Sequence, residues 1–183
     1  MEEEKKPAKS RRNETYQDLR ILAAVLTGLI LAFVFVTRIL VVSGSSMENT
    51  LHNGNAMLVW SLGYKPKQGD IVVLTQTSYQ EDSIVKRVIA TGGQTVDIDY
   101  NTGTVYVDGA ALREDYIKER MEVPHYGEGL NHITVPEGCI FVMGDNRNHS
   151  ADSRYPAIGI VDERSVIGHV LLVLFPLSAF GTR

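Results

Sequence analysis

The residues with the clearest chemical potential lie in the segment VVSGSSMENTL, residues 41–51, which follows the most apolar run in the chain. The segment holds three serines, at positions 43, 45 and 46, beside a glycine and a methionine. A serine hydroxyl becomes an effective nucleophile only when a neighbouring base removes its proton. A plain flexible linker would have a similar composition, so the nucleophile hypothesis depends on finding that base elsewhere in the chain.

A lysine inside an apolar run is the best candidate for the base. Lys86 follows Ile84 and Val85 and, beyond Arg87, precedes Val88. Burial disfavours the charged ammonium group and lowers its pKa by up to about 3–5 units, which makes a neutral amine available near pH 7. Taken alone, the Lys86–Arg87 pair is more typical of the charged residues on an edge strand.

Other catalytic signatures are weak. The nucleophile-elbow pattern G-x-S-x-G begins at Gly44 but ends on Glu48 instead of glycine. The pattern S-x-x-K occurs at 83–86, where β-branched neighbours favour a strand, and positions three apart on a strand point to opposite faces. The five histidines lack the H-E-x-x-H spacing of zinc enzymes. A Ser-His-Asp triad would need His149 and Asp152, from one turn-like segment, to converge on a distant serine.

An apolar run precedes the serines and can hold them at a membrane. Residues 21–37 are 17 residues without a charge, and ILVV at 39–42 continues the run after Arg38. At about 1.5 Å per residue the run reaches ~26–33 Å, the thickness of the hydrocarbon core of a bilayer. Basic residues cluster on its N-terminal side, which by the positive-inside rule stays in the cytoplasm. We expect a basic cytoplasmic tail, a single transmembrane helix in the cell membrane and a domain on the outer face, at residues 1–20, 21–42 and 43–183.

The outer part has the pattern of a β domain. Short runs rich in β-branched and aromatic residues are separated by turn signals such as NTG at 101–103 and GG at 92–93. Only residues 111–122 have mixed helical character. The pattern predicts a mostly β fold, a closed or half-closed sheet assembly, with a smaller charged subdomain at about 98–138. The strand candidates are residues 56–62, 70–76, 84–90, 95–100, 104–108, 139–144 and 167–175.

Charge and cysteine content argue against several classes of function. The formal net charge is −4 at pH 7, and the acidic excess lies in the outer part, which argues against binding to nucleic acid. The single cysteine, Cys139, excludes an internal disulfide and any cysteine-based metal cluster. We expect neither a metal nor any other cofactor.

Three groups of residues together resemble the type I (leader) signal peptidase family. SGSSMENTL at 43–51 is similar to the family's serine segment, and GDIVV with VKRVIATGG at 69–73 and 85–93 is similar to the two segments that follow it. MGDNRNHSADSRYPAIG at 143–159 is similar to the last and most specific segment. The likeness covers roughly residues 10–175 and is that of a compact bacterial member with a single anchor.

The resemblance implies a serine endopeptidase with a Ser-Lys dyad and a signal-peptidase-like β-sheet assembly. The nucleophile of the family falls on Ser46 and its general base on Lys86. By the same likeness Ser150 helps to hold the lysine, and Asp152 and Arg154 form a structural ion pair beside the site.

Three further positions belong to the expected site. Asp145 is part of the same last segment, as a supporting residue. Gly44 stands where some members have a serine that supports the oxyanion, so backbone N–H groups, that of Ser46 included, would have to stabilise the oxyanion. Asn49 stands where the family usually has proline, which would fix the backbone more firmly.

The implied function is the removal of signal peptides from exported preproteins through an acyl-enzyme. Such preproteins carry an A-x-A type of cleavage site and are held in the lipid bilayer, so anchoring the peptidase there would raise the effective concentration of both partners. The candidate walls of the substrate pocket are Met47, Leu51, Val42, Ile84 and Val85.

Two alternatives keep the β domain and change its role. One is a membrane-tethered, non-catalytic domain that binds peptides, in which Asn49 marks the decay of the site. The other is a Ser-Lys protease of the self-cleaving type, which would have no use for an anchor.

Overall fold

The computed structural model describes residues 8–75, 83–122 and 131–181, and the chain divides into two compact units, Met1–Thr37 and Arg38–Arg183. Some sequence-based expectations fall outside the described residues. They concern the first seven residues of the cytoplasmic tail, residue 76 of one strand candidate and residues 123–130 of the smaller subdomain.

The first unit is one long helix, α1 (Ala8–Val36). Thr37 follows the helix, and its hydroxyl donates a hydrogen bond of 2.8 Å to the Phe33 carbonyl. The next residues form strand β1 (Thr37–Val41), in which three of the five side chains are β-branched and favour extended backbone. The helical part of the expected segment 21–42 therefore ends at Val36. In the described residues, no helix combines the length and the apolar character needed to cross a membrane.

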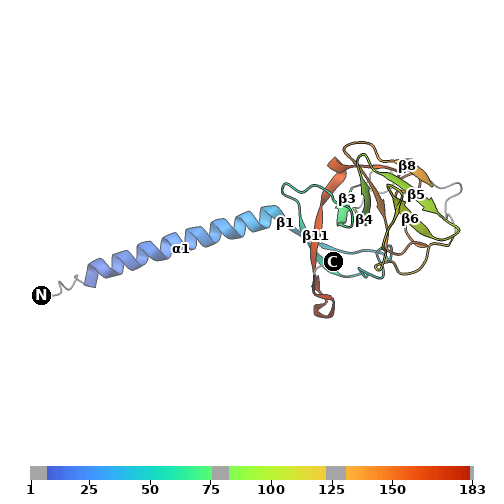
Figure 1. Ribbon diagram of the computed structural model, residues 1–183. Helices are drawn as coiled ribbons and strands as arrows, with labels where there is room; N and C mark the ends of the chain where they lie inside the picture. Colours follow the sequence, from blue (N-terminus) through green and yellow to red (C-terminus); the bar gives the residue numbers. More distant parts are fainter. Residues whose placement is uncertain (1–7, 76–82, 123–130, 182–183) are drawn as a thin grey trace, which may run out of the picture. The chain divides into compact units, whose positions relative to one another are not determined.

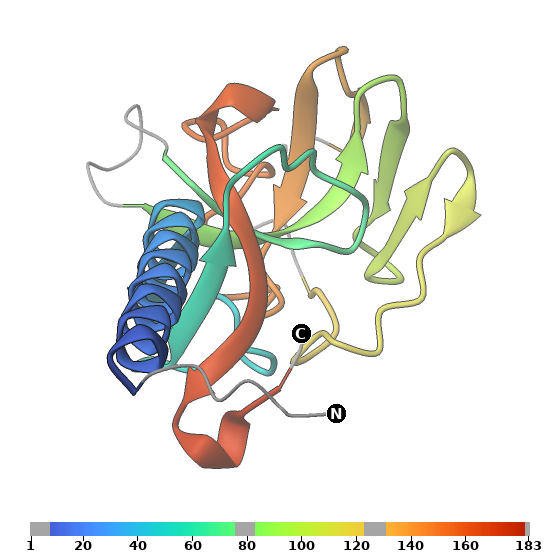
Figure 2. The same cartoon turned by 90° about the vertical axis from the view of Figure 1, so that its left-hand side faces the viewer.

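Seven strands form the larger sheet, in the order β1-β2-β11-β3-β4-β9-β10. The long strand β11, red in Figure 2, runs beside β2 and pairs antiparallel with both β2 and β3, so a C-terminal strand fills the middle of the sheet. Strand β4 pairs antiparallel with β3 on one side and with β9 on the other. The bounds are β2 (Ala56–Trp60), β3 (Ile71–Leu74), β4 (Ile84–Thr91), β9 (Cys139–Met143), β10 (Val161–Asp162) and β11 (Val166–Phe175).

Four strands form a smaller antiparallel sheet, in the order β7-β6-β5-β8. Figure 1 shows its strands β5, β6 and β8 gathered together at one end of the second unit. The expected hairpin turn NTG joins β5 to β6, with Gly103 at a φ of 68° that glycine adopts readily. The bounds are β5 (Thr95–Asp99), β6 (Thr104–Val107), β7 (Ala110–Ala111) and β8 (His132–Thr134), and two 3₁₀ turns are η1 (Glu163–Ser165) and η2 (Leu177–Ala179).

The expectation of a mostly β fold with one N-terminal helix is confirmed, and each strand candidate overlaps an observed strand, although β4 ends one residue later and β11 begins one residue earlier than expected. The smaller sheet begins at Thr95, slightly before the expected start of the subdomain. Among the described residues, this sheet has no separate core. Its buried side chains share one apolar cluster with side chains of the larger sheet, including Ala90, Phe141 and Met143.

The expected helical character of residues 111–122 is wrong, because this segment contains no regular helix. Its side chains and backbone bind buried groups of the second unit instead. Glu114 binds Arg147 through both carboxylate oxygens, and the N–H of Lys118 donates to the Asp145 carbonyl. These contacts replace the helical hydrogen bonds that the local sequence alone would allow.

Candidate active site

The serine segment forms a series of tight turns that is held in place by buried apolar side chains. The N–H groups of Thr50 and Leu51 both donate to the Met47 carbonyl, at 2.9 and 2.8 Å. Met47 and Leu51 are buried in the apolar cluster beneath, together with Val42. Ser46, immediately before Met47, is only half-buried. Burial of the neighbouring apolar side chains thus holds the hydroxyl of Ser46 at the surface of the domain.

Gly44 and Asn49 flank this turn. Gly44 has a φ of 96°, a conformation that favours glycine, and its N–H donates to the side-chain oxygen of Asn53 at 3.0 Å. The N–H of Gly44 is therefore already occupied, and support of an oxyanion by other backbone N–H groups, that of Ser46 included, stays a prediction. The peptide bond between Glu48 and Asn49 is cis.

The side chain of Lys86 contacts the side chain of Ser46 in the serine loop. Lys86 lies within β4, where it is paired with Val72 of β3, and its side chain is 3% exposed. The Nζ atom donates to the Ser46 Oγ at 2.7 Å and to the Val85 carbonyl at 3.0 Å. The expected nucleophile and the expected base, 40 positions apart in the sequence, are therefore in direct contact.

The environment of Lys86 favours the neutral amine. Burial lowers the pKa of Lys86 from 10.5 to about 8; the nearby charge of Arg154 acts in the same direction, and those of Asp152 and Asp145 oppose it. A substantial fraction of the side chain is consequently uncharged at mildly alkaline pH. A neutral amine within hydrogen-bond distance of a hydroxyl can act as its general base.

Three buried ion pairs lie behind the dyad. They are Arg87–Asp145 and Arg147–Glu114, both at 2.6 Å, and Arg154–Asp152 at 2.8 Å. Each arginine is matched by one carboxylate, so the cluster is balanced without Lys86. Asp152 and Asp145 of these pairs raise the pKa of Lys86 and Arg154 lowers it, so burial is what keeps the pKa of this lysine low.

Asp152 is held by the arginine that the sequence analysis assigned to it. Burial opposes ionisation of Asp152, but the Arg154 guanidinium and the Gly144 N–H favour the carboxylate, and the pKa of Asp152 stays below its usual value. Arg154 donates to both carboxylate oxygens at 2.8 Å. Because both oxygens bind Arg154, Asp152 is poorly placed to orient His149 as a triad would require.

Ser150 packs directly on Gly144. A β-carbon added at Gly144 would collide with the Ser150 side chain and with the Ser46 carbonyl oxygen. Within the described residues, the acceptors of Lys86 Nζ are Ser46 Oγ and the Val85 carbonyl. Support of the lysine by Ser150 therefore stays a prediction, while the contact with Gly144 brings Ser150 close to the nucleophile loop.

Asn146 is a site residue that the sequence analysis missed. It is 1% exposed, its backbone N–H donates to the Ser46 carbonyl at 3.0 Å, and its side-chain amide donates to the Ser45 carbonyl at 3.0 Å. These two bonds fix the backbone on both sides of the nucleophile. The only signal in the sequence was the position of Asn146 within the segment 143–159, next to Asp145.

A cavity of about 230 Å³ adjoins the dyad. Four of the five residues expected to form the pocket line it, and Leu51 is instead fully buried in the cluster below the serine loop. Ser83, part of the S-x-x-K pattern, also lines the cavity, but the hydroxyl that receives the Lys86 hydrogen bond is that of Ser46. The lining residues are Val41, Val42, Ser43, Ser46, Met47, Ser83, Ile84, Val85 and Lys86.

Comparison with known proteins adds independent evidence. Residues 15–175 match the family described as signal peptidase, peptidase S26. A protein named "Probable signal peptidase I-1" from Synechocystis sp. is 39% identical over 88% of this chain and 82% of its own length. Signal peptidase I of Bacillus licheniformis is 37% identical over 97% of both chains, and that of Mycobacterium tuberculosis is 32% identical over 98% of this chain and 78% of its own length.

Among solved structures, a signal peptidase I from Enterococcus faecalis matches 58% of this chain and 97% of its own chain, with 34% identity and a TM-score of 0.47. The family match spans most of the chain, and the relatives are matched over most of their own lengths. This chain belongs to the signal peptidase family, peptidase S26.

Proposed function

We propose that Ser46 and Lys86 form the catalytic dyad with which this chain cleaves signal peptides from exported preproteins. The observation that carries the proposal is the hydrogen bond of 2.7 Å from a buried lysine to the half-buried serine. Membership of the family gives the activity itself: the chain is a serine endopeptidase that removes signal peptides.

The proton would move along this hydrogen bond. Ser46 Oγ attacks the scissile carbonyl carbon while Lys86 Nζ accepts the hydroxyl proton, and the same proton passes to the amine that leaves when the peptide bond breaks. Water then attacks the ester carbonyl carbon and gives a proton to Lys86 Nζ, which passes it to Ser46 Oγ as the ester bond breaks and the carboxylic acid product leaves. The backbone N–H of Ser46 is the donor that we assign to the oxyanion, because the N–H of Gly44 is engaged with Asn53.

The cavity beside the dyad has the size and the lining to accept a small side chain of the substrate residue before the cleaved bond. Met47, Val42, Ile84 and Val85 give it apolar walls, and its volume is about 230 Å³. We expect small side chains of the A-x-A type there, with the extended peptide adding as a strand beside the residues that line the cavity. The partners would thus be preproteins whose cleavage sites carry small residues.

The proposal includes an anchor in the cell membrane, with the N-terminus in the cytoplasm and the second unit on the outer face. Residues 21–37 carry no charge, and basic residues precede them. The consecutive side chains of Leu29, Ile30 and Leu31 are all more than half exposed, although successive helical residues point to different faces. An apolar surface on every face of a helix favours contact with lipid.

The test is cleavage of a preprotein with an A-x-A site by the detergent-solubilised full chain. Ser46→Ala and Lys86→Ala should each abolish cleavage, because each removes one partner of the proton transfer. Ser178→Ala and Lys67→Ala, which remove the same groups from exposed positions away from the dyad, should retain it. Melting temperatures of all four variants would show whether folding is intact. Substantial cleavage by either dyad variant would contradict the proposal.

A further inference from the structure

The segment of residues 112–121, called here the strap, crosses from the smaller sheet to the buried charges behind the dyad. It follows β7 and contains the residues for which sequence alone indicated a helix. Each of the three arginines in the buried ion pairs is contacted by at least one residue of the strap. The mechanism proposed above assigns no task to these contacts.

Tyr116 lies in the middle of the strap and covers two of the arginines. The guanidinium carbon of Arg87 is 4.0 Å from the centre of the Tyr116 ring, and that of Arg147 is 6.0 Å away. These distances are typical of a cation–π interaction for Arg87 and mark the limit of one for Arg147. Arg87 directly follows the proposed base in β4 and binds Asp145, so the ring closes over the residue beside Lys86.

The other strap contacts flank the ring. On one side Glu114 binds Arg147 through both carboxylate oxygens, at 2.6 and 3.1 Å. On the other side Met121, which is buried, accepts a hydrogen bond from Arg154 at 3.1 Å. The strap thereby packs against the cluster of buried ion pairs. Two members of this cluster, Asp145 and Arg154, act on the pKa of Lys86 through their charges.

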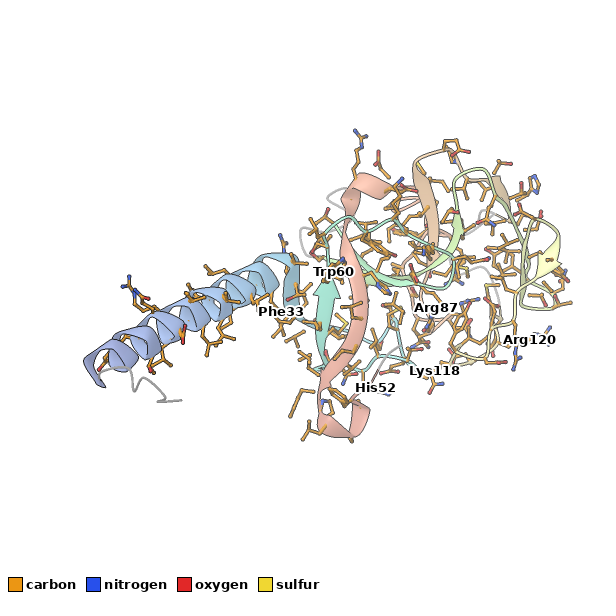
Figure 3. The ribbon with its side chains drawn as sticks, turned by 60° about the vertical axis from the view of Figure 1, so that its left-hand side comes forward. Phe33, His52, Trp60, Arg87, Lys118 and Arg120 are labelled. Atoms are coloured by element: carbon orange, nitrogen blue, oxygen red, sulfur yellow. The ribbon has the colours of Figure 1, made fainter. Side chains whose placement is uncertain are left out.

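The strap also reaches the nucleophile loop. Lys118 donates through its backbone N–H to the Asp145 carbonyl at 3.0 Å and through its Nζ to Glu48 at 2.8 Å. Glu48 is two residues beyond Ser46 in the serine loop. Figure 3 labels Arg87 of β4 and Lys118 of the strap, which are joined through Asp145. One segment therefore contacts both the strand of the base and the loop of the nucleophile.

We propose that the strap is a positioning element of the active site and that Tyr116 is its central positioning residue. The inference rests on the Ser46–Lys86 dyad proposed above. The Tyr116 ring excludes water from the Arg87–Asp145 pair, and Lys118 ties the serine loop to the same aspartate. Together they hold the charged groups behind the dyad in place and keep the Ser46 hydroxyl within reach of the Lys86 amine. Within the described residues, the ring and hydrogen-bond contacts of Tyr116 are with Arg87, Arg147 and Glu114, and not with Ser46 or Lys86.

The test compares Tyr116→Leu with Tyr116→Phe in the detergent-solubilised full chain, with a preprotein carrying an A-x-A site as substrate. The acyl-enzyme burst counts active sites, so that kcat is expressed per correctly folded molecule. In Tyr116→Leu water reaches the cluster, and we expect kcat to fall about tenfold with KM little changed, and the rising limb of the pH–rate profile to move up by about one pH unit. Tyr116→Phe keeps the ring and loses only the 3.3 Å hydrogen bond from the hydroxyl to Glu114, so its kcat and pH–rate profile should stay close to those of the unaltered chain.

Asp115→Ala is the matched control within the strap. Its side chain is 71% exposed and pairs with Arg113, which is 87% exposed, so its loss should change neither kcat nor the pH–rate profile. Lys118→Met is a second test that does not depend on the fold of the Tyr116 variant, because the Lys118 side chain is 41% exposed. We expect a smaller fall in kcat in the same direction, since the tether to Glu48 is lost.

A merely structural role would lower the melting temperature and the number of active sites while leaving kcat per site and the pH–rate profile unchanged. That result for Tyr116→Leu, or unchanged kinetics in Lys118→Met if Tyr116→Leu does not fold, would overturn the role of the strap. Failure of the dyad itself is recognised separately. It would appear as cleavage by Ser46→Ala or Lys86→Ala, whatever the strap variants do.

Discussion

At the scale of single residues, the proposed chemistry depends on whether Lys86 carries a proton. The hydrogen bond from Lys86 Nζ to Ser46 Oγ has the length needed for proton transfer, but only the neutral amine can accept the proton. The pKa of Lys86 is lowered to about 8 by burial, against 10.5 for an ordinary lysine. The protonation state of this one group should therefore control the rate.

The pH–rate profile tests this dependence. We expect kcat/KM for a preprotein substrate to rise with pH and to level off above a midpoint near 8, because the base form of Lys86 grows in with its pKa. Cleavage rates measured between pH 6 and about 10 with initial-rate assays give the midpoint. A midpoint at the unperturbed lysine value would mean that the amine is solvated and would contradict the proposed role of burial.

The same group should reduce the stability of the fold. The unfolded chain keeps the Lys86 proton up to about pH 10.5, whereas the folded chain releases it near pH 8. The destabilising contribution of the buried Lys86 charge is therefore present in full below pH 8. It decreases as the pH rises from 8 and is lost at about pH 10.5. The difference between the two pKa values of Lys86 corresponds to about 3 kcal/mol in the free energy of unfolding.

Lys86→Met should consequently be inactive yet more stable at pH 7, by up to about 3 kcal/mol in free energy of unfolding. The difference in stability between the variant and the unaltered chain should decrease between pH 8 and 10.5, because the unaltered chain is no longer destabilised by a charged Lys86 there. Urea denaturation of both chains at pH 7 and pH 10 measures the two differences. A variant that is equally destabilised at both pH values would show that packing, not charge, decides the effect of this residue.

At the scale of elements, the end of β9 and the loop after it bring the site together. Gly144 follows β9 and leaves room for both Ser150 and the Ser46 carbonyl, and Asn146 binds the backbone on both sides of the nucleophile. The nucleophile loop is thus held from below by buried apolar side chains and from the side by this segment. A change in either support should move Ser46 relative to Lys86.

Gly144→Ala tests the lateral support. The added methyl group would meet the Ser150 side chain and the Ser46 carbonyl, so the serine loop must shift or the segment after β9 must open. We expect at least about a hundredfold loss of kcat/KM, together with destabilisation of about 1–3 kcal/mol. Steady-state kinetics and urea denaturation measure the two effects.

Gly28→Ala is the corresponding control, because nothing lies within 4 Å of the added carbon there and alanine is favoured in a helix. It should leave cleavage unchanged. Full activity of Gly144→Ala would mean that the close contact at Gly144 does not position the nucleophile.

At the scale of the whole molecule, the proposed anchor and the catalytic unit would share one membrane with the substrate. An enzyme and a preprotein that are both held in the same layer meet at a high effective concentration. Activity towards preproteins in membranes should then depend on the apolar run, whereas cleavage chemistry should depend only on the second unit.

Charges placed in the apolar run test this division. The double variant Leu26→Lys, Ile30→Lys should be released from membranes by alkaline extraction, because each central lysine costs about 2.5–3.5 kcal/mol on insertion scales. A lysine at Gln17, before the run, should leave the protein in the membrane fraction. Retention of the double variant in the membrane fraction would contradict the anchor, while its rate on a soluble peptide reports on the second unit alone.

The local sequence was sufficient for most strands, because alternation of apolar and polar residues is a short-range property. The β-branched run around Lys86 gave β4, and NTG gave the turn between β5 and β6. The same short-range reasoning was wrong for the strap, where helical propensity was outweighed by ion pairs and hydrogen bonds to residues far along the chain. It also assigned Leu51 to the pocket, although Leu51 anchors the serine loop from within the core.

The sequence by itself determined which serine and lysine to examine, the class of the fold and the family resemblance, since all three depend on residue types at fixed local spacing. Only the tertiary structure decided that β11 lies between β2 and β3, that Asn146 fixes the backbone around Ser46, and that a strap closes over Arg87. The physical reason is that these contacts join residues far apart in the chain, and their geometry exists only once the sheets have packed.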